Sequence, residues 1–342
     1  MHQERKLDHL RICLEEDVQS PNPPRGFEQY HFIHQALPEI DLAEVQVSTK
    51  LLGKDLNAPL VISSMTGGTK EAEHINLNLA QAAGEMGVAM GVGSLRAALE
   101  DPSLAYTYQV RRVAPDILLL ANLGAVQLNY GYGPEECHRA VEMIEADALI
   151  LHLNPLQECL QPDGNTNFST LLPKIEEVCH ALSVPVVVKE VGWGISKRVA
   201  EMLAKAGVAA IDVAGSGGTS WSEVERHRAL DEKMVNTAQS FADWGIPTAE
   251  SIQIVRQGAP RTAIIASGGL RTGVDVAKAI ALGAHATGIA TPFLGPATIG
   301  PQAVVDRLEE IIEPLRIAMF CIGLTNLEAL RDTPLLQKSG RG

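Results

Sequence analysis

The sequence predicts an α/β protein folded as a (β/α)8 barrel of the TIM type, with an N-terminal extension and C-terminal helices. A unit of short apolar strand, polar or glycine-rich strand end and amphipathic helix recurs eight times between residues 58 and 342. The strands are nearly continuous runs of Val, Ile and Leu, which is typical of a parallel sheet covered by helices. The 342 residues also suffice for one barrel of about 250 residues with additions.

The composition is that of an ordinary folded enzyme. Hydrophobic residues make up 46% and charged residues 20%, and the formal net charge of -13 argues against a general nucleic-acid binder. The five cysteines form no CxxC pair, so neither a disulfide framework nor a zinc site is expected. The N-terminus is charged and no window approaches ~18 apolar residues, so we expect a cytoplasmic protein without a membrane segment.

Residues 1–57 are expected to form an extension that caps the barrel and contributes substrate-binding residues, while residues 58–342 form the barrel and its C-terminal helical segment. A short helix is expected around Arg5–His9, and the proline-rich stretch 21–24 marks an irregular connection. A short helix with strands is expected over residues 27–47, capping one end of the barrel.

Eight strands and eight helical stretches alternate after the extension. The predicted strands are Pro59–Ser64, Val88–Val92, Ile117–Asn122, Ala148–Leu153, Pro185–Lys189, Ala209–Val213, Thr262–Ser267 and His285–Ile289. The predicted helices are Glu71–Met86, Leu104–Arg112, Pro134–Ile144, Thr170–Leu182, Ser196–Ala206, an elaborated Val224–Gln257, Gly273–Leu282 and Gln302–Cys321. A doubly wound sheet is the competing fold, but no GxGxxG sequence follows the first strand.

The strand ends carry polar side chains where a purely structural strand would carry aliphatic ones. Asn122, His152, Lys189 and Asp212 are expected to be buried in succession, and they need a shared polar partner such as a bound cofactor. In a barrel these ends converge on one mouth, where the chemistry lies. Lys189 is there either a Schiff-base amine or a cation that stabilises negative charge on a ring cofactor, and an ion pair with Asp212 is the structural alternative.

One strand end combines several such groups. At the strand period of two, His152 and Asn154 share a face with Ile150, and Pro155 ends the strand. Gln157 and Glu158 are expected in the following loop, as a hydrogen-bonding or proton-handling group beside an oxygen ligand for a hard cation. The alternative is a satisfied core histidine followed by an ordinary polar loop.

Glycine-rich strand ends predict a phosphate site. The segments 267–273 (SGGLRTG) and 288–290 (GIA) follow the last two strands, where barrels bind phosphate through backbone N–H groups and a helix N-terminus. A structural tight turn is the alternative. The segment 215–219 (GSGGT) is a second cradle or a mobile loop.

Basic residues from separate segments predict an anion site despite the acidic net charge. Arg96, together with Arg5, Lys6, His9 and His152, would form a cationic nest suited to a diphosphate. Glu158 would hold the Mg2+ that usually accompanies a diphosphate.

Seven motifs in this order resemble type 2 isopentenyl-diphosphate isomerase, and the resemblance covers essentially the whole chain. They are Arg5-Lys6-x-x-His9, Met65-Thr66-Gly67-Gly68, Gly93-Ser94-x-Arg96, Asn154-Pro-x-Gln157-Glu158-x-x-Gln161-Pro-x-Gly164, Lys189-Glu190-x-Gly192-x-Gly194, Asp212-x-x-Gly215-x-Gly217-Gly218-Thr219-Ser-Trp221 and Ser267-Gly-Gly269-x-Arg271. Seven motifs in one order are highly specific, whereas each alone is weak.

The resemblance implies an FMN-dependent enzyme that interconverts isopentenyl and dimethylallyl diphosphate without net redox change, requiring Mg2+ and a flavin reduced by NADPH. It implies these FMN-binding residues: Ser64, Met65, Thr66, Gly67, Ser94, Asn122, Lys189, Thr219, Gly269, Leu270, Arg271, Ala290 and Thr291. It implies these substrate-binding residues: Arg5, Lys6, His9, Ser94, Arg96, His152 and Gln157. Glu158 would bind the metal. The resemblance also implies a small-molecule diphosphate as the substrate, and a homotetramer or homo-octamer as the oligomeric state.

Chemistry supports this interpretation and leaves two alternatives. Moving a double bond by one carbon passes through a carbocation-like state, which needs a dry pocket and nearby negative charge. We expect reduced FMN to serve as acid and base, with Lys189 as its counter-ion and Gln157 orienting the alkene or assisting. The alternatives are an FMN-dependent net oxidoreductase, disfavoured because segment 266–269 (ASGG) lacks a histidine base, and a non-catalytic phosphometabolite-binding barrel.

Overall fold

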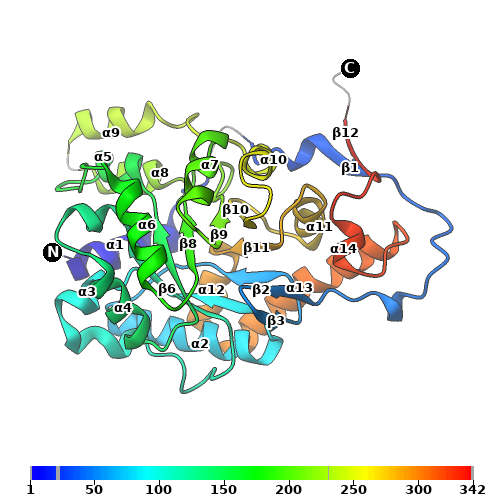
Figure 1. Cartoon of the computed structure of the whole chain (residues 1–342), viewed down its shortest axis with the longest axis horizontal. Helices are drawn as coiled ribbons and strands as arrows, with labels where there is room; N and C mark the ends of the chain where they lie inside the picture. The colour runs from blue at the N-terminus through cyan, green and yellow to red at the C-terminus, as the bar shows by residue number, and fades with distance from the viewer. Residues whose placement is uncertain (1, 21–23, 230, 340–342) are drawn as a thin grey trace.

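The structure is a computed structural model that describes residues 2–20, 24–229 and 231–339, without the side chains of residues 2–5 and 7. Its centre is a closed parallel barrel with the strand order β10-β11-β4-β5-β6-β7-β8-β9 (Figure 1). The strands are β4 Leu60–Ile62, β5 Ala89–Gly91, β6 Leu119–Gly124, β7 Ala148–His152, β8 Val186–Lys189, β9 Ala210–Asp212, β10 Ala263–Ser267 and β11 Ala286–Ile289. The predicted (β/α)8 barrel is therefore confirmed, with every strand end within two residues of its predicted position.

Helices cover the outside of the barrel. Seven of them lie close to predicted helical stretches: α2 Lys70–Met86, α4 Pro134–Met143, α6 Leu171–Ala181, α7 Lys197–Lys205, α10 Thr248–Gly258, α11 Gly273–Ala281 and α13 Pro301–Phe320. None of the helices in the described part of the chain has the length and apolarity that a membrane crossing requires.

Two predicted helices need correction, and two helices near the mouth were not predicted. The helix predicted over Leu104–Arg112 is wrong: α3 Arg96–Glu100 is followed by the 3-10 helix η3 Pro102–Thr107, because Asp101 caps η3 and Pro102 starts it. The stretch predicted as Val224–Gln257 is broken into α8 Trp221–Arg228, α9 Glu232–Gln239 and α10. Helix α12, Thr291–Ile299, was not predicted. Gln157 and Glu158 lie on helix α5, Pro155–Leu160, because Pro155 is compatible with a first helical turn.

Apolar side chains fill the barrel interior. Val61, Leu120, Ile150, Val187 and Ile265 belong to one buried cluster formed mainly by inward-facing strand residues. The end of the barrel opposite the mouth is closed by a hairpin of β2 Thr49–Leu51 and β3 Lys54–Leu56, which inserts Leu51 and Leu56 into the same cluster. The barrel is therefore a packed core that is open to ligands at one end only.

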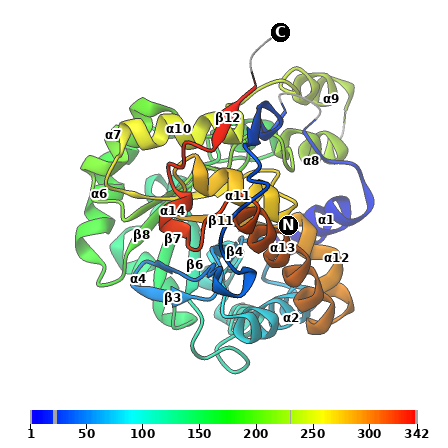
Figure 2. The same cartoon turned by 90° about the vertical axis from the view of Figure 1, so that its right-hand side faces the viewer.

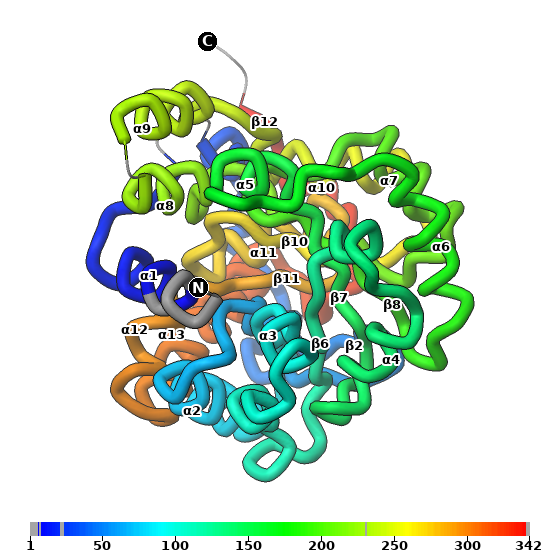
Figure 3. Tube along the Cα trace, turned by 90° about the vertical axis from the view of Figure 1, so that its left-hand side faces the viewer, coloured from blue at the N-terminus to red at the C-terminus, as the bar shows by residue number. Residues whose placement is uncertain are grey.

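The N-terminal extension reaches both ends of the barrel. Helix α1, His2–Glu15, packs on α8 and α12 at the mouth, as Figure 3 shows. After the 3-10 helix η1, Phe27–Gln29, strand β1, Tyr30–Phe32, pairs antiparallel with β12, Leu336–Lys338, near the C-terminus (Figure 2). The 3-10 helix η2, Leu42–Glu44, packs on α13, and α14, Leu327–Leu330, packs on α11.

We expect Leu51→Ala to destabilise the fold by about 2–5 kcal/mol, because the side chain is 1% exposed and its removal leaves a cavity beneath the barrel core. Urea unfolding followed by circular dichroism measures the change. The control is Leu37→Ala, since Leu37 is 77% exposed and its removal is expected to change stability by less than about 0.5 kcal/mol. Equal effects of the two substitutions would contradict the role of the hairpin as a plug.

Candidate functional site

A polar layer lies directly on the apolar core of the barrel, at the mouth that faces the viewer in Figure 3. Each of its members follows an inward-facing apolar residue by two positions, so it shares the inner face of the strand. The polar side chains of the layer are those of Ser63, Asn122, His152, Lys189, Asp212 and Ser267, and Gly91 and Gly288 occupy the two remaining strand positions. The parallel pairing places His152 beside Lys189 and Lys189 beside Asp212.

Lys189 is half-buried beside the acidic residues Asp212 and Glu190. Burial lowers the pKa of Lys189, whereas the charges of Asp212 and Glu190 oppose that shift. Its Nζ donates a hydrogen bond to the backbone oxygen of Glu190 at 2.7 Å, and no direct ion pair with Asp212 occurs in the described part of the chain. Burial also raises the pKa of Asp212, against the Lys189 charge and a 2.5 Å hydrogen bond from the Ser267 hydroxyl. Lys189 is therefore available to a ligand at the mouth.

His152 is a neutral hydrogen-bonding group in this structure. Burial, together with the positive charge of Lys189, lowers the pKa of His152 to about 3. Its Nδ1 lies 2.8 Å from Oδ1 of Asn122, and this acceptor requires Nδ1 to carry the proton. Desolvation and the neighbouring lysine both disfavour the imidazolium, so in this structure His152 offers the predicted anion site a hydrogen-bonding group.

Glu190 organises the loop after β8. One of its carboxylate oxygens accepts hydrogen bonds from the backbone N–H groups of Val191, Gly192 and Trp193 at 2.6, 2.7 and 2.6 Å. Burial raises the pKa of Glu190 to about 7, although these three hydrogen bonds and the Lys189 charge act in the opposite direction. No role was predicted for Glu190, although it stands in the motif Lys189-Glu190-x-Gly192-x-Gly194.

A cavity of about 540 Å³ opens at the mouth. Twelve of the predicted FMN-binding residues line it: Ser64, Met65, Thr66, Gly67, Ser94, Lys189, Thr219, Gly269, Leu270, Arg271, Ala290 and Thr291. Asn122 does not, because it faces His152 in the neighbouring cavity. We refer to this space as the first cavity.

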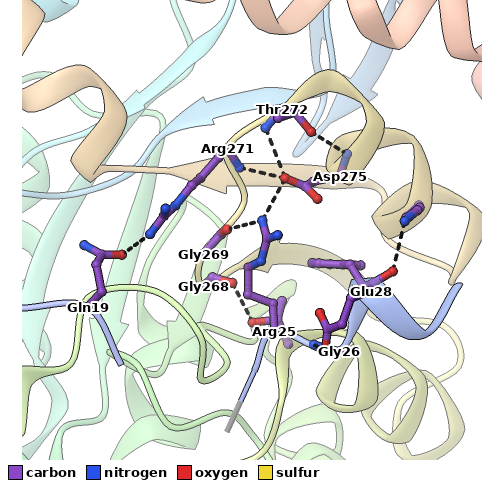
Figure 4. A network of polar contacts seen from close by, with 12 residues as sticks. Gln19, Arg25, Gly26, Glu28, Gly268, Gly269, Arg271, Thr272 and Asp275 are labelled. Atoms are coloured by element: carbon purple, nitrogen blue, oxygen red, sulfur yellow. Dashed lines mark hydrogen bonds and ion pairs between the residues drawn. The ribbon is translucent and has the colours of Figure 1, made fainter. Parts of the chain in front are cut away.

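The loops after β9 and β10 pack so closely that only glycine fits. A Cβ on Gly268 would lie 2.1 Å from the Gly215 oxygen, and one on Gly218 would lie 2.5 Å from the Gly269 nitrogen. The extension secures these loops: Arg25 donates to the Gly269 oxygen at 3.0 Å and to Asp275 at 2.9 Å (Figure 4). Backbone groups are thereby exposed to the first cavity without intervening side chains.

The two helices that begin near these loops differ in what occupies their N-termini. Helix α11 is closed by its own capping box, in which Thr272 and Asp275 bond each other's backbone N–H groups. Helix α12 has no side-chain cap at Ala290, and its first residue Thr291 lines the first cavity. The helix dipole expected at the phosphate site therefore comes from α12, which the sequence did not reveal.

Two features of the first cavity suit a flavin mononucleotide: the glycine-rich loops expose backbone groups to it, and some of its buried polar atoms have no hydrogen-bond partner among the described residues. Ser63 and Ser64 line it, and their hydroxyl groups are buried without a hydrogen-bond partner among the described residues. Native proteins rarely leave buried polar groups unpaired, so these hydroxyls indicate a polar ligand. The uncapped α12 end suits a phosphate group.

A second cavity of about 170 Å³ adjoins the first, and Ser94 and Lys189 line both. It is lined by these predicted substrate and metal residues: Lys6, His9, Ser94, Arg96, His152, Gln157 and Glu158. The structure thus brings together residues from α1, the loop after β5, α3, β7 and α5. The side chain of Arg5 lies outside the described residues.

Helix α5 presents Gln157 and Glu158 to the second cavity, and both are buried. Oε1 of Glu158 accepts from Asn154 Nδ2 at 2.9 Å, while Oε2 accepts from Gln161 Nε2 at 2.6 Å and from the Asn165 backbone at 2.5 Å. Three of roughly four acceptor positions of the carboxylate are thus used, which leaves one for a cation. Asn154 Nδ2 also donates to Gln157 Oε1 at 3.1 Å.

Helix α1 is held over the cavities from two sides. Lys6 Nζ bonds Tyr108 Oη at 2.5 Å and the Ser94 oxygen at 3.2 Å, and burial raises the pKa of Tyr108. His9 Nε2 lies 3.0 Å from the buried carboxylate of Glu225. Burial alone would raise the pKa of Glu225, but His9 and Arg228 bring it below its ordinary value. Tyr108 and Glu225 were missed in the sequence because they lie outside the strand ends.

A closed barrel with a glycine-lined phosphate cradle and a buried lysine at its mouth defines a class of enzymes that bind a phosphorylated cofactor. The chain matches the FMN-dependent dehydrogenase family over residues 3–104 and 155–337. The flavin-binding domain of baker's yeast flavocytochrome b2 has the same fold at 16% identity, with a TM-score of 0.70 over 94% of this chain and 79% of that one. A mandelate oxidase variant gives a TM-score of 0.65 at 19% identity, covering 96% of this chain and 91% of that one.

Other relatives are much more similar in sequence. The chain is 55% identical over 336 residues to the isopentenyl-diphosphate delta-isomerase of Nostoc sp. (strain PCC 7120), covering 98% of this chain and 96% of that protein. It is 54% identical over 327 residues to the enzyme of the same name from Rickettsia peacockii, covering 96% of this chain and 95% of that protein. The chain belongs to the isopentenyl-diphosphate delta-isomerase family, within the wider family of FMN-dependent dehydrogenases.

We expect Glu190→Gln to change how stability depends on pH. The pKa of Glu190 is higher in the folded than in the unfolded chain, so the folded protein retains this proton and loses stability as the pH rises from about 4.5 to about 7. Glutamine removes this contribution. The free energy of unfolding of the variant should therefore rise relative to that of the wild type by roughly 1.4 kcal/mol per pH unit within that window. Urea unfolding at several pH values measures the difference.

The control is Glu177→Gln, which changes an exposed carboxyl group on α6. Its unfolding is measured at the same pH values, and any pH dependence that it shows is subtracted as the effect of removing a surface carboxyl group. Parallel stability curves for Glu190→Gln and the wild type would contradict the raised pKa.

Proposed function

We propose that this protein isomerises isopentenyl diphosphate to dimethylallyl diphosphate without net redox change, with FMN in the first cavity and magnesium diphosphate in the second. The observation that carries the proposal is that the two cavities share one wall, formed in part by Ser94 and Lys189. A flavin and a small diphosphate would therefore meet at a buried polar surface. Family membership supports the same reaction.

The residues proposed to hold FMN are those predicted from the sequence that line the first cavity. Gly269 and the N-terminus of α12 would bind the phosphate, while Ser64, Thr66 and Lys189 would face the ring system. Asn122 would act indirectly, because its carboxamide orients His152. When bound, reduced FMN supplies an electron-rich ring that can exchange a proton and stabilise positive charge.

The second cavity is proposed to hold the diphosphate. Lys6, His9 and Arg96, with Arg5 from the same helix as Lys6, would bind its oxygens, and His152 would contribute Nε2 as a neutral hydrogen-bonding group. No group of three His, Cys, Asp or Glu side chains suited to a metal occurs among the described residues. Glu158 would therefore share Mg2+ with the diphosphate and water, as is common for this ion.

The protein's own groups would control the environment of the alkene. Helix α1 packs on α8 and α12 beside the cavities, and with substrate bound it would limit the access of water, which would otherwise trap a carbocation-like state. Lys189 would place positive charge against the flavin ring. Because burial lowers the pKa of Lys189, its Nζ would release a proton more readily than an exposed lysine. Gln157 would orient the alkene end of the substrate.

Three further features belong to the proposal. NADPH would reduce the flavin, because the reaction itself provides no electrons. The family resemblance favours a homotetramer or homo-octamer, and the composition favours a cytoplasmic location.

The test is an anaerobic assay with purified protein, FMN, NADPH, Mg2+ and isopentenyl diphosphate, which records dimethylallyl diphosphate and the flavin spectrum. We expect catalytic product formation with far less than one NADPH consumed per turnover. NADPH consumed one for one with product would favour the net oxidoreductase, and a protein that binds no flavin would favour the non-catalytic barrel.

We expect Glu158→Gln to raise the Mg2+ concentration for half-maximal activity by about tenfold or more, because the amide keeps the shape but loses the charge that attracts the cation. A magnesium titration of the initial rate measures the effect. Cys159→Ala is the control, since Cys159 is exposed on the same helix. An unchanged magnesium requirement in Glu158→Gln would remove Glu158 from the metal site.

A further inference from the structure

The loop between α5 and α6, residues 161–170, runs against the backbone of the helix that carries Glu158. A Cβ on Gly164 would lie 1.8 Å from the Glu158 oxygen and 2.7 Å from its carbonyl carbon. Only glycine permits this approach. The next residue, Asn165, is thereby brought to the edge of the second cavity.

Asn165 contacts the two charged groups that would receive magnesium diphosphate. Its backbone N–H donates to Glu158 Oε2 at 2.5 Å, and its side-chain Oδ1 accepts from Arg96 Nη1 at 3.0 Å. Gln127 Nε2 donates to the same Oδ1 at 3.0 Å. Because arginine only donates hydrogen bonds, the atom facing Arg96 must be the carbonyl oxygen of the amide.

Arg96 is held on its other side by its own helix. Its Nε donates to Glu100 Oε1 at 2.8 Å. Arg96 and Glu158 carry opposite charges and line one cavity of about 170 Å³, yet no direct ion pair joins them in the described part of the chain. In a direct ion pair, Arg96 could not bind the diphosphate and Glu158 could not bind the cation. Asn165 lies between the two side chains and bridges them without charge.

We propose that Asn165 is a positioning residue that holds Arg96 and Glu158 apart, at the spacing required by a diphosphate and its magnesium ion. The inference rests on the proposed function for its ligand. Asn165 acts through the two charged side chains and needs no contact with substrate. Gly164 allows this arrangement by letting the loop approach α5.

The test measures binding of inorganic diphosphate with Mg2+ to the flavin-containing protein by isothermal titration calorimetry. Asn165→Ala removes the acceptor for Arg96 and keeps the backbone N–H that serves Glu158. We expect a dissociation constant about tenfold higher, as for other residues that orient metal or anion ligands, with unchanged flavin content. The control is Asn167→Ala, an exposed position in the same loop whose side chain bonds the Ser169 N–H, and it should bind normally.

A double-mutant cycle separates positioning from general loss of structure. In an Arg96→Ala background, Asn165→Ala should weaken binding by less than about twofold, because its partner is already absent. An equal loss in both backgrounds, or wild-type binding by Asn165→Ala, would overturn the proposal. Gly164→Ala should weaken binding as well, since the loop must move away from Glu158, and normal binding by this variant would equally count against it.

The result is independent of the isomerase assay. A wild type that isomerises isopentenyl diphosphate while Asn165→Ala binds magnesium diphosphate normally would leave the function standing and refute the role of Asn165. A wild type that binds magnesium diphosphate in the Asn165-dependent way but forms no dimethylallyl diphosphate would refute the function alone. A wild type that binds no magnesium diphosphate would overturn both.

Discussion

The site depends on one constraint, the burial of a charged and polar layer directly on the apolar core of a closed barrel. Side chains alternate along each strand, so the inner face carries Val187 and then Lys189, Ile150 and then His152, Ala210 and then Asp212. Desolvation is the largest cause of the shifted pKa in all three polar residues. Their environment keeps His152 neutral and places Lys189 beside Asp212, ready for a polar ligand.

The N-terminal extension completes this mouth. Arg25 ties the loop after β10 to Asp275, and Gln19 receives a hydrogen bond from Arg271 (Figure 4). Because Asp275 already occupies the N-terminus of α11, the uncapped end of α12 is left for an anion. The local capping box of α11 thus decides which helix dipole is left to face the first cavity.

The two cavities differ in the way that their polar groups are satisfied. The first leaves serine hydroxyls and a helix end without protein partners, as expected for a site that a large cofactor fills. The second is crossed by a network of neutral amides from Asn154, Gln161 and Asn165 around Glu158. Neutral donors hold a carboxylate in place without neutralising it, so its charge remains for a cation.

The sequence by itself determined the barrel, because nearly continuous apolar strands that alternate eight times with amphipathic helices are local patterns and predict a parallel sheet covered by helices. It also placed Lys189, His152 and Glu158 at the mouth, since strand ends of a parallel barrel meet there. The tertiary structure decided what depends on contacts between distant segments. These include the lowered pKa of His152, which follows from burial and from the neighbouring Lys189 charge, and the position of Asn165 between Arg96 and Glu158. Desolvation and hydrogen bonding depend on which groups become neighbours, and spacing along the chain does not specify that.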